Sequence, residues 1–231
     1  MAGILYAIPT PLGGTAAESL PAPALEIVRS LRDFVVENAK SARAFLKSAG
    51  SDPKENRILE LNPQSAMQEL LQPIRDGRSI GLLSEAGCPA IADPGAALVE
   101  AAQREAIRVV PLVGPSSIVL ALMASGLEGQ RFAFCGYLPR EAEARKRRIR
   151  ELEARSRRER ETQIFIETPY RNDALLVSLL EVASEKTWLC VATDLTLPTE
   201  LIQTQSISRW RGAHHPIGKR PTVFLLLSVN R

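Results

Sequence analysis

The chain has 231 residues, of which 45% are hydrophobic and 24% are charged, with 29 lysines and arginines against 26 acidic residues. This length allows one large domain or two small ones, and the apolar fraction excludes a disordered chain or a low-complexity tail. The basic residues behind the net charge of +3 are concentrated in one segment. Residues 140–160 hold ten basic residues and five glutamates, a local charge of +5, which leaves the rest of the chain at −2.

Three cysteines, Cys88, Cys135 and Cys190, lie far apart in the sequence. Because their number is odd and no pair has the short spacing of a zinc site, we expect buried thiols in a reducing compartment, without disulfides and without a metal. The longest apolar stretch, residues 118–124, is far shorter than the ~18 residues of a membrane span. We therefore expect a cytoplasmic protein with no membrane segment.

Short β-like runs alternate with helical stretches along the first half, which is typical of α/β architecture. The pattern predicts, in chain order, a strand at 4–8, a helix at 24–31, a strand at 34–36 and a helix at 41–47. A helix that opens at Asn62-Pro63 and runs to about Arg75, a strand at 79–83 and a helix at 95–106 follow. Asn62-Pro63 and Asp93-Pro94 each combine a helix cap with proline at the first helical position.

The second half continues the alternation. A strand is predicted at 108–112, a helix at 115–124, a strand at 132–134, a long helix at 141–158, a strand at 163–166, a helix at 172–183, and strands at 188–192 and 223–229. The turn Val113-Gly114-Pro115 is the predicted domain boundary, which gives α/β domains of residues 1–113 and 114–231.

Several common types of site are missing from the sequence. There is neither a G-x-G-x-x-G dinucleotide fingerprint nor a G-x-x-x-x-G-K-[ST] phosphate loop. The two histidines, His214 and His215, are adjacent and cannot form a helical zinc pair, so we expect them in an exposed loop.

Three junctions between a strand and a helix are rich in glycine, proline and serine: residues 9–14, 84–95 and 113–117. Ligands of open α/β sheets bind at the carboxyl ends of the strands, and small residues let the backbone approach a ligand closely. Each junction alone could be an ordinary capped turn. The three together, in this order, indicate a ligand site.

At these junctions the chain resembles the tetrapyrrole methylase superfamily, the class III S-adenosylmethionine-dependent methyltransferases. Within it, the chain is similar to the ribosomal RNA small-subunit methyltransferase I group, which methylates a cytidine 2′-hydroxyl. The motifs that carry the resemblance are Ile8-Pro9-Thr10-Pro11-Leu12-Gly13, Leu83-Ser84-Glu85-Ala86-Gly87-Cys88-Pro89 with Asp93-Pro94-Gly95, Val110-Pro111-Leu112-Val113-Gly114-Pro115-Ser116-Ser117, Ala124-Ser125-Gly126-Leu127, Phe134-Cys135-Gly136-Tyr137-Leu138-Pro139 and Phe165-Ile166-Glu167-Thr168-Pro169-Tyr170-Arg171.

The resemblance implies two α/β domains with a cofactor cleft between them, and a homodimer. It implies S-adenosyl-L-methionine as the cofactor, held largely by backbone groups. The residues implied in its binding are Pro11, Leu12, Ser84, Glu85, Ala86, Pro89, Ile91, Ser116, Ser117 and Thr168.

Two acidic residues are the candidates for catalysis. Glu37 follows a predicted strand, where a carboxylate can orient or deprotonate a substrate hydroxyl; its alternative role is a helix cap or an ion pair with Lys40 or Arg43. The resemblance adds Glu167, next to Thr168. The chain departs from the family pattern at both places. Val36-Glu37-Asn38-Ala39-Lys40 replaces Ala-Glu-Asp-Thr-Arg, and Glu167-Thr168-Pro169-Tyr170-Arg171 replaces Glu-Ser-Pro-His-Arg. Because of these departures, the substrate can differ from that of the group.

The density of basic residues in 140–160 is typical of phosphate contacts to RNA. The alternative is a solvated helix with the pairs Glu141–Arg145, Glu143–Arg147 and Glu151–Arg155. Since only Ile149 and Leu152 offer sizeable apolar contact, this helix is expected to project from the body. It has no aromatic residue to stack bases, so bases must be recognised elsewhere. The candidate RNA contacts are Lys40, Arg43, Arg145, Lys146, Arg147 and Arg148.

The sequence therefore predicts an S-adenosylmethionine-dependent methyltransferase whose partner is RNA or the small ribosomal subunit, with a ribose 2′-oxygen as the acceptor. Two alternatives stay open. One is methylation of a tetrapyrrole or another small molecule, and the other is a non-catalytic protein that binds the cofactor or RNA.

Overall fold

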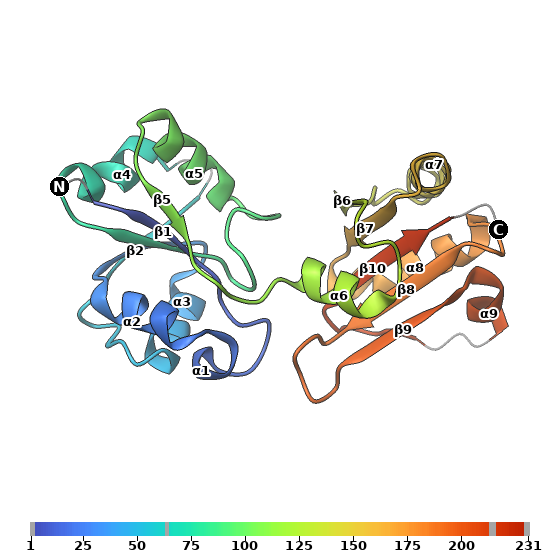
Figure 1. The fold of residues 1–231 in the computed structure, drawn as a ribbon, viewed down its shortest axis with the longest axis horizontal. Coiled ribbons are helices and arrows are strands. Elements are labelled where there is room, and N and C mark those ends of the chain that lie inside the picture. The colour runs from blue at the N-terminus through green and yellow to red at the C-terminus, as the bar shows by residue number, and fades with distance from the viewer. Residues whose placement is uncertain (1–2, 63–64, 213–215, 229–231) are drawn as a thin grey trace. The chain divides into compact units, whose positions relative to one another are not determined.

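A computed structural model describes residues 3–62, 65–212 and 216–228. The chain forms two compact units, Met1–Ser116 and Ser117–Arg231 (Figure 1). The division lies after Ser116, whereas the predicted boundary lies after Val113. Each unit has its own sheet and its own hydrophobic core.

The N-terminal unit is built on five parallel strands in the order β3-β2-β4-β1-β5. The strands are β1 (Leu5–Ile8), β2 (Asp33–Val36), β3 (Arg57–Glu60), β4 (Ile80–Leu83) and β5 (Val109–Pro111). The central strands β2 and β4 are buried along their whole length, as expected for a parallel sheet covered on both faces.

Five helices cover the two faces of this sheet (Figure 1). One face carries α1 (Ala16–Ser19), α2 (Ala22–Ser30) and α3 (Ala39–Ser48), which share a core cluster around Val28, Phe34 and Leu46. The other face carries α4 (Met67–Arg75) and α5 (Gly95–Arg104), which pack around Leu71 and Leu98.

The C-terminal unit has a mixed sheet in the order β6-β7-β10-β8-β9, in which only β6 and β7 run parallel. The strands are β6 (Phe132–Tyr137), β7 (Thr162–Ile166), β8 (Trp188–Thr193), β9 (Leu201–Ser206) and β10 (Thr222–Leu227). The helices are α6 (Ser117–Ser125), α7 (Ala142–Glu159), α8 (Asn172–Val182) and α9 (Ile207–Gly212), with a 3₁₀ turn, η1, at Pro169–Arg171.

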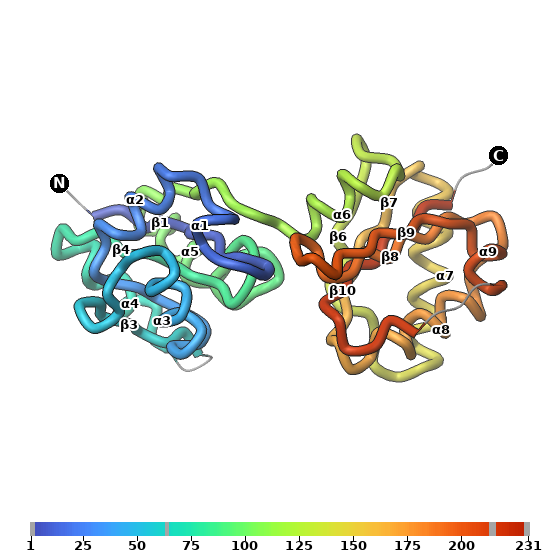
Figure 2. Tube along the Cα trace, turned by 90° about the horizontal axis from the view of Figure 1, so that it is seen from below, coloured from blue at the N-terminus to red at the C-terminus, as the bar shows by residue number. Residues whose placement is uncertain are grey.

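The core of this unit lies between the sheet and the helices α7, α8 and α9. The rings of Phe165 and Phe224 stack there at 5.9 Å between centroids, on the adjacent strands β7 and β10. Helix α6 packs against β8, β9 and β10, and Figure 2 shows it on the other side of these strands from α7 and α8.

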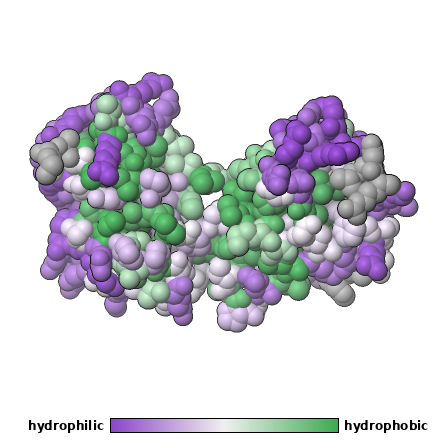
Figure 3. All heavy atoms as spheres, in the orientation of Figure 1, coloured by the Kyte–Doolittle hydropathy of each residue, from purple (hydrophilic) through white to green (hydrophobic). Residues whose placement is uncertain are grey.

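Helix α7 differs from its prediction. It does not project from the body, because Arg145, Ile149, Leu152, Glu153 and Ser156 are buried against the unit. The sequence signal was incomplete because two charged side chains and a serine join the apolar residues on the buried face. Hydrophilic residues cover the outer side of α7, at the upper right of Figure 3.

Hydrogen bonds explain how charged residues of α7 are accommodated in the interior. The Glu153 carboxylate accepts bonds from the backbone N–H of Ser184 at 2.8 Å and from the hydroxyls of Ser184 and Thr187. The Ser156 hydroxyl accepts a bond from the backbone N–H of Ser228 at 2.9 Å. These bonds fix α7 to the sheet and to the loop before β8.

The predicted i,i+4 ion pairs of α7 are not formed. Glu141 caps the helix instead, accepting from the backbone N–H groups of Glu143 and Ala144. Glu143 and Glu151 pair at i,i+3 with Lys146 and Arg148, and Arg155 pairs with Glu161 beyond the helix end.

Other differences occur at polar edge strands and helix ends. The strands β3 and β9, at the edges of their sheets, and the helices α1 and α9 were not predicted. β3 and β9 lack the apolar runs that mark a buried strand. The helix predicted from Asn62 begins at Met67, and Pro63 lies outside the described residues.

Candidate active site

The parallel order of the N-terminal sheet brings several loops to one edge. All five strands end at the same edge, so the segments after β1, β2, β4 and β5 meet there. They contain the three breaker-rich junctions and Glu37. This is the edge at which open α/β sheets bind ligands.

The first and second junctions are joined by hydrogen bonds. The backbone groups of Thr10 and Gly87 exchange two bonds, of 2.9 and 3.0 Å. The Thr10 hydroxyl donates to the carbonyl of Ser84 at 3.2 Å, and the Ser84 hydroxyl donates to the carbonyl of Gly87 at 2.8 Å. Ser84 is buried, so its side chain shapes the loop from within.

The loop between β4 and α5 has an unusual backbone. Gly87, Ala90 and Ala92 adopt φ values of +77°, +65° and +61°. A left-handed alanine costs about 1–2 kcal/mol, and such strain concentrates at ligand clamps. Asp93 holds the turn, because its Oδ1 accepts the N–H groups of Ala90 at 2.8 Å and of Gly95 at 2.7 Å.

The third junction packs closely against the first two. A Cβ atom at Gly114 would lie 2.4 Å from Cβ of Pro9, so only glycine fits there without a shift of the backbone. The Cys88 thiol donates to the carbonyl of Pro115 at 3.3 Å. The three junctions therefore form one connected surface rather than three separate turns.

Acidic side chains gather at this edge. The Glu37 carboxylate accepts the backbone N–H of Glu85 at 3.2 Å. Burial raises the pKa of Glu37, and the neighbouring charges of Asp93 and Glu85 raise it further. Burial also raises the pKa of Asp93, whose Oδ2 is buried without a hydrogen-bond partner among the described residues. A negative edge of this kind is suited to a cationic ligand.

The structure brings most of the predicted cofactor residues together. Glu85, Ala86 and Ile91 are exposed on the loop after β4, and Pro11 and Leu12 are half-buried on the loop after β1. Ser84 and Pro89 are buried inside the loop, so their side chains do not line an open surface. Ser116 ends the N-terminal unit, whereas Ser117 and Thr168 belong to the C-terminal unit.

Glu167 lies in the C-terminal unit, at the carboxyl end of β7. Its side chain is 1% exposed and forms an ion pair with Arg171. It also accepts the backbone N–H of Thr168 at 2.7 Å, and Arg171 Nε donates to the Thr168 hydroxyl at 3.2 Å. These contacts hold the Glu167 side chain in the interior of the C-terminal unit, and its predicted catalytic role stays a prediction. The same contacts fix the turn that follows β7.

The predicted RNA contacts fall into different environments. Lys40 and Arg43 are exposed on α3, and Arg147 is exposed on α7. Lys146 pairs with Glu143 at 3.2 Å and with Glu181 at 2.9 Å, and Arg148 pairs with Glu151 at 3.0 Å.

Arg145 is a correction. Its residue is 8% exposed, and its guanidinium donates to the Ser178 hydroxyl at 2.9 Å and to the carbonyl of Arg140 at 2.8 Å. It cannot reach RNA from this position. Arg150, which was not singled out, is exposed and forms no ion pair within the described part of the chain. The helical spacing of three residues from Arg147 could have indicated it.

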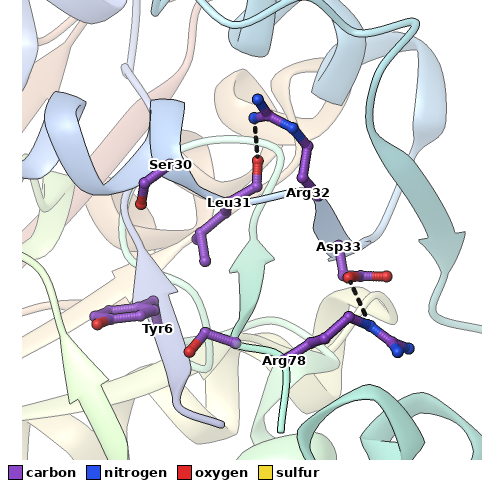
Figure 4. Close-up of a pocket in the computed structure, with 7 residues that line it drawn as sticks. Tyr6, Ser30, Leu31, Arg32, Asp33 and Arg78 are labelled. Atoms are coloured by element: carbon purple, nitrogen blue, oxygen red, sulfur yellow. Dashed lines mark hydrogen bonds and ion pairs between the residues drawn. The ribbon is translucent and has the colours of Figure 1, made fainter. Parts of the chain in front are cut away.

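A pocket of about 340 Å³ lies at the opposite edge of the N-terminal sheet (Figure 4). It is lined by Tyr6, Ser30, Leu31, Arg32, Asp33, Arg78 and Ser79. Asp33, the first residue of β2, pairs with Arg57 at 2.9 Å and with Arg78 at 3.3 Å. Since this pocket is at the amino ends of the strands, it is separate from the junction surface.

Residues 3–62, 65–212 and 216–228 include no group of three or more histidine, cysteine or acidic side chains that could hold a metal ion. Within the same ranges, no helix is both long enough and apolar enough to cross a bilayer. His214 and His215, predicted in an exposed loop, lie outside the described residues.

Comparison with solved structures identifies the fold. Over 98% of its length the chain superposes on the methyltransferase CobJ, with a TM-score of 0.66, 17% identity and 95% of that chain covered. Diphthine synthase superposes with a TM-score of 0.65 and 15% identity, over 98% of this chain and 90% of that chain. At these identities the likeness establishes the fold.

The sequence matches the family of Tetrapyrrole (Corrin/Porphyrin) Methylases over residues 5–209. It is 35% identical to "Ribosomal RNA small subunit methyltransferase I" of Vibrio cholerae over 87% of this chain and 68% of that protein. The protein of the same name from Haemophilus influenzae is 31% identical over 91% of this chain and 72% of that protein. The chain belongs to the tetrapyrrole methylase family and is a methyltransferase.

Proposed function

We propose that this protein transfers a methyl group from S-adenosyl-L-methionine to RNA of the small ribosomal subunit, at a ribose 2′-oxygen. The observation that carries the proposal is its similarity, at 35% identity over 87% of the chain, to a ribosomal RNA small subunit methyltransferase. The carboxylates of Glu37, Glu85 and Asp93 at the carboxyl edge of the sheet support the choice of cofactor, because the sulfonium and the amino group of S-adenosylmethionine are positively charged.

The residues present fit this cofactor. Glu85, Ala86 and Ile91 expose small or flexible side chains on a strained loop, and Asp93 of the same loop has a buried Oδ2 with no hydrogen-bond partner among the described residues. Pro11, Leu12 and Ser116 belong to the same unit as this loop, and Ser117 and Thr168, in the C-terminal unit, stay predicted cofactor contacts. When bound, the cofactor supplies an already activated methyl group, so the protein has mainly to position the acceptor oxygen in line with it.

Glu37 is the proposed proton acceptor. It lies directly after β2, at the same edge as the junctions, and the backbone N–H of Glu85 orients its carboxylate. Because burial raises the pKa of Glu37, its carboxylate is a stronger base than an exposed one. A raised pKa brings a carboxylate closer to the range in which general bases operate.

The proposed RNA contacts are basic residues of each unit, exposed or half-buried. Lys40 and Arg43 lie on α3, which begins two residues after Glu37. On α7 the contacts are Lys146, Arg147 and Arg148, joined by Arg150 in place of Arg145. Since Lys146 and Arg148 share their charge with glutamates, Arg147 and Arg150 carry most of the phosphate affinity.

The proposal includes a cytoplasmic homodimer that needs no metal ion. Light scattering of the purified chain tests the dimer, and a methyl-transfer rate that chelator leaves unchanged tests metal independence.

The test of function is incubation with methyl-labelled S-adenosylmethionine and small ribosomal subunits that lack the modification, followed by mapping of the label. Label in RNA at a ribose confirms the proposal. Glu37→Gln is expected to abolish most of the transfer, and Glu69→Gln, an exposed residue of α4, is the matched control. Label in tetrapyrroles but not in RNA contradicts the RNA substrate, and failure to bind the cofactor in calorimetry contradicts the enzymatic role.

A further inference from the structure

An exposed aromatic ring stands on a rigid turn of the C-terminal unit. Tyr170 belongs to the turn η1 after β7, and it is 79% exposed. The proline before it restricts the backbone, and the N–H of Arg171 donates to the carbonyl of Thr168 at 2.9 Å. The buried ion pair between Arg171 and Glu167 fixes the turn from beneath. The ring contributes little to the core, yet its backbone is held in place.

A lysine from a distant part of the sequence lies over this ring. Nζ of Lys219 is 5.0 Å from the ring centroid of Tyr170. The segment that carries Lys219 is anchored at the start of α8, where Oδ1 of Asp173 accepts the backbone N–H of Ile217 at 2.7 Å. Nδ2 of the fully buried Asn172 donates to the carbonyl of Arg220 at 2.7 Å.

These bonds hold the backbone of the two segments in place before any ligand binds. The segments that carry the ring and the ammonium group do not have to be ordered on binding, which lowers the entropic cost of recognition. One face of the ring is next to Lys219, and the large exposed fraction of Tyr170 leaves room for a flat group on the other face.

The pair has the chemistry that the basic helix lacks. Unpaired bases bind proteins by stacking on aromatic rings, and neighbouring cations hold the phosphates. Helix α7 supplies cations but contains no aromatic residue. Because β6 and β7 run parallel, the chain enters α7 at the same sheet edge at which it enters the turn of Tyr170. One strand of RNA could therefore contact both.

We propose that Tyr170 stacks an unpaired nucleobase of the RNA substrate and that Lys219 contacts a phosphate beside that base. This inference rests on the proposed function for its RNA ligand. It assigns base contacts to Tyr170 and leaves α7 with phosphate contacts only.

The first measurement is the affinity of the full chain for a fluorescent single-stranded RNA of twelve nucleotides and for a duplex of the same sequence. Tyr170→Ala is expected to weaken single-strand binding by about 5- to 100-fold, the range measured for loss of one stacked base. Tyr170→Phe keeps the ring and should bind like the wild type. Lys219→Gln is expected to reduce the slope of log affinity against log salt by about 0.7.

Matched controls lie at the other end of the same sheet. Trp188, at the start of β8, is an exposed aromatic residue, and Lys186 is exposed just before it. Trp188→Ala and Lys186→Gln should leave RNA affinity and salt dependence unchanged. Thermal unfolding by circular dichroism verifies that each variant is folded.

Two results would overturn the inference while the proposed function stands. In the first, the wild type methylates ribosomal subunits, and Tyr170→Ala has the same oligonucleotide affinity and the same KM for subunits as the wild type. The second is an equal loss in Tyr170→Phe and Tyr170→Ala, because the hydroxyl and not the ring would then be the contact. A wild type that neither binds RNA nor methylates subunits contradicts the proposed function itself.

Discussion

Replacement of Arg145 by alanine should separate the stability of the C-terminal unit from the RNA binding that we propose for α7. The guanidinium of Arg145 makes hydrogen bonds of 2.9 Å to the Ser178 hydroxyl and 2.8 Å to the carbonyl of Arg140, and the residue is 8% exposed. Arg147, two positions further on, is exposed. The two arginines look alike in the sequence but should behave oppositely when they are replaced.

The expected loss of stability follows from those contacts. A hydrogen bond from a charged group contributes about 1.5–3 kcal/mol, and the two bonds of one guanidinium are not fully additive. We expect Arg145→Ala to lower the free energy of unfolding of the C-terminal unit by about 3 kcal/mol. With a urea m-value of about 2 kcal/mol/M, the midpoint falls by about 1.5 M. Arg147→Ala should change it by less than about 0.5 kcal/mol.

Tryptophan fluorescence during urea unfolding is the suitable assay. Both tryptophans, Trp188 and Trp210, lie in the C-terminal unit, so the signal reports on the unit that contains α7. Under native conditions Arg145→Ala should keep the salt slope of RNA binding, whereas Arg147→Ala should reduce it by about 0.7 for single-stranded RNA. Equal midpoints for the two variants, or a reduced salt slope in Arg145→Ala, would refute the assignment of Arg145 to the interior.

The remaining predictions concern the junction surface. The rate of methyl transfer should fall as the pH drops through the pKa of Glu37. Because burial raises that pKa, the fall should occur at a higher pH than for an ordinary carboxylate. Glu37→Gln should remove this acidic fall from the pH–rate profile of the remaining activity. Asp93→Asn keeps an oxygen that can accept the loop N–H groups but removes the negative charge. Because burial raises the pKa of Asp93, the charged carboxylate is disfavoured in the fold, and its loss at neutral pH should not destabilise the free protein. The same variant should weaken cofactor binding, measured by calorimetry, about fivefold. The fold disfavours the charged form of Asp93. Any stability that Asp93→Asn gains over the wild type is therefore present above the raised pKa of Asp93 and disappears as the pH falls below that pKa. Gly114→Ala should destabilise the N-terminal unit by about 1–3 kcal/mol in thermal unfolding because its Cβ would lie 2.4 Å from Cβ of Pro9, whereas Gly129→Ala, where nothing lies within 4 Å, should not.

Much of the N-terminal fold could be predicted from local patterns. Ile80–Leu83 is an apolar run between breakers, and such a run forms a buried strand wherever the chain places it. The strands Arg57–Glu60 and Leu201–Ser206 were missed, because their residues are exposed or half-buried and do not form an apolar run. Their assignment depends on backbone pairing with a neighbour, which leaves no periodic signal.

One part of the candidate site could likewise be predicted from the sequence, and another part could not. Glycine and proline after β1, β4 and β5 predicted the junction surface, because parallel strands of one sheet end at the same edge. The inward orientation of Ser84 and Glu167 could not be predicted. Their hydrogen bonds to Gly87 and Arg171 turn both side chains inward, and side-chain direction depends on loop conformation.

Local properties such as composition, periodicity and turn chemistry were enough to predict the α/β class, the loops that meet at the carboxyl edge and the basic character of residues 140–160. Local patterns did not show which basic residues are accessible, because Arg145 donates a hydrogen bond to Ser178 on another helix. Nor did they show that Lys219 lies over Tyr170, since 49 positions separate the two residues. Contacts between distant segments depend on packing, which local sequence does not encode.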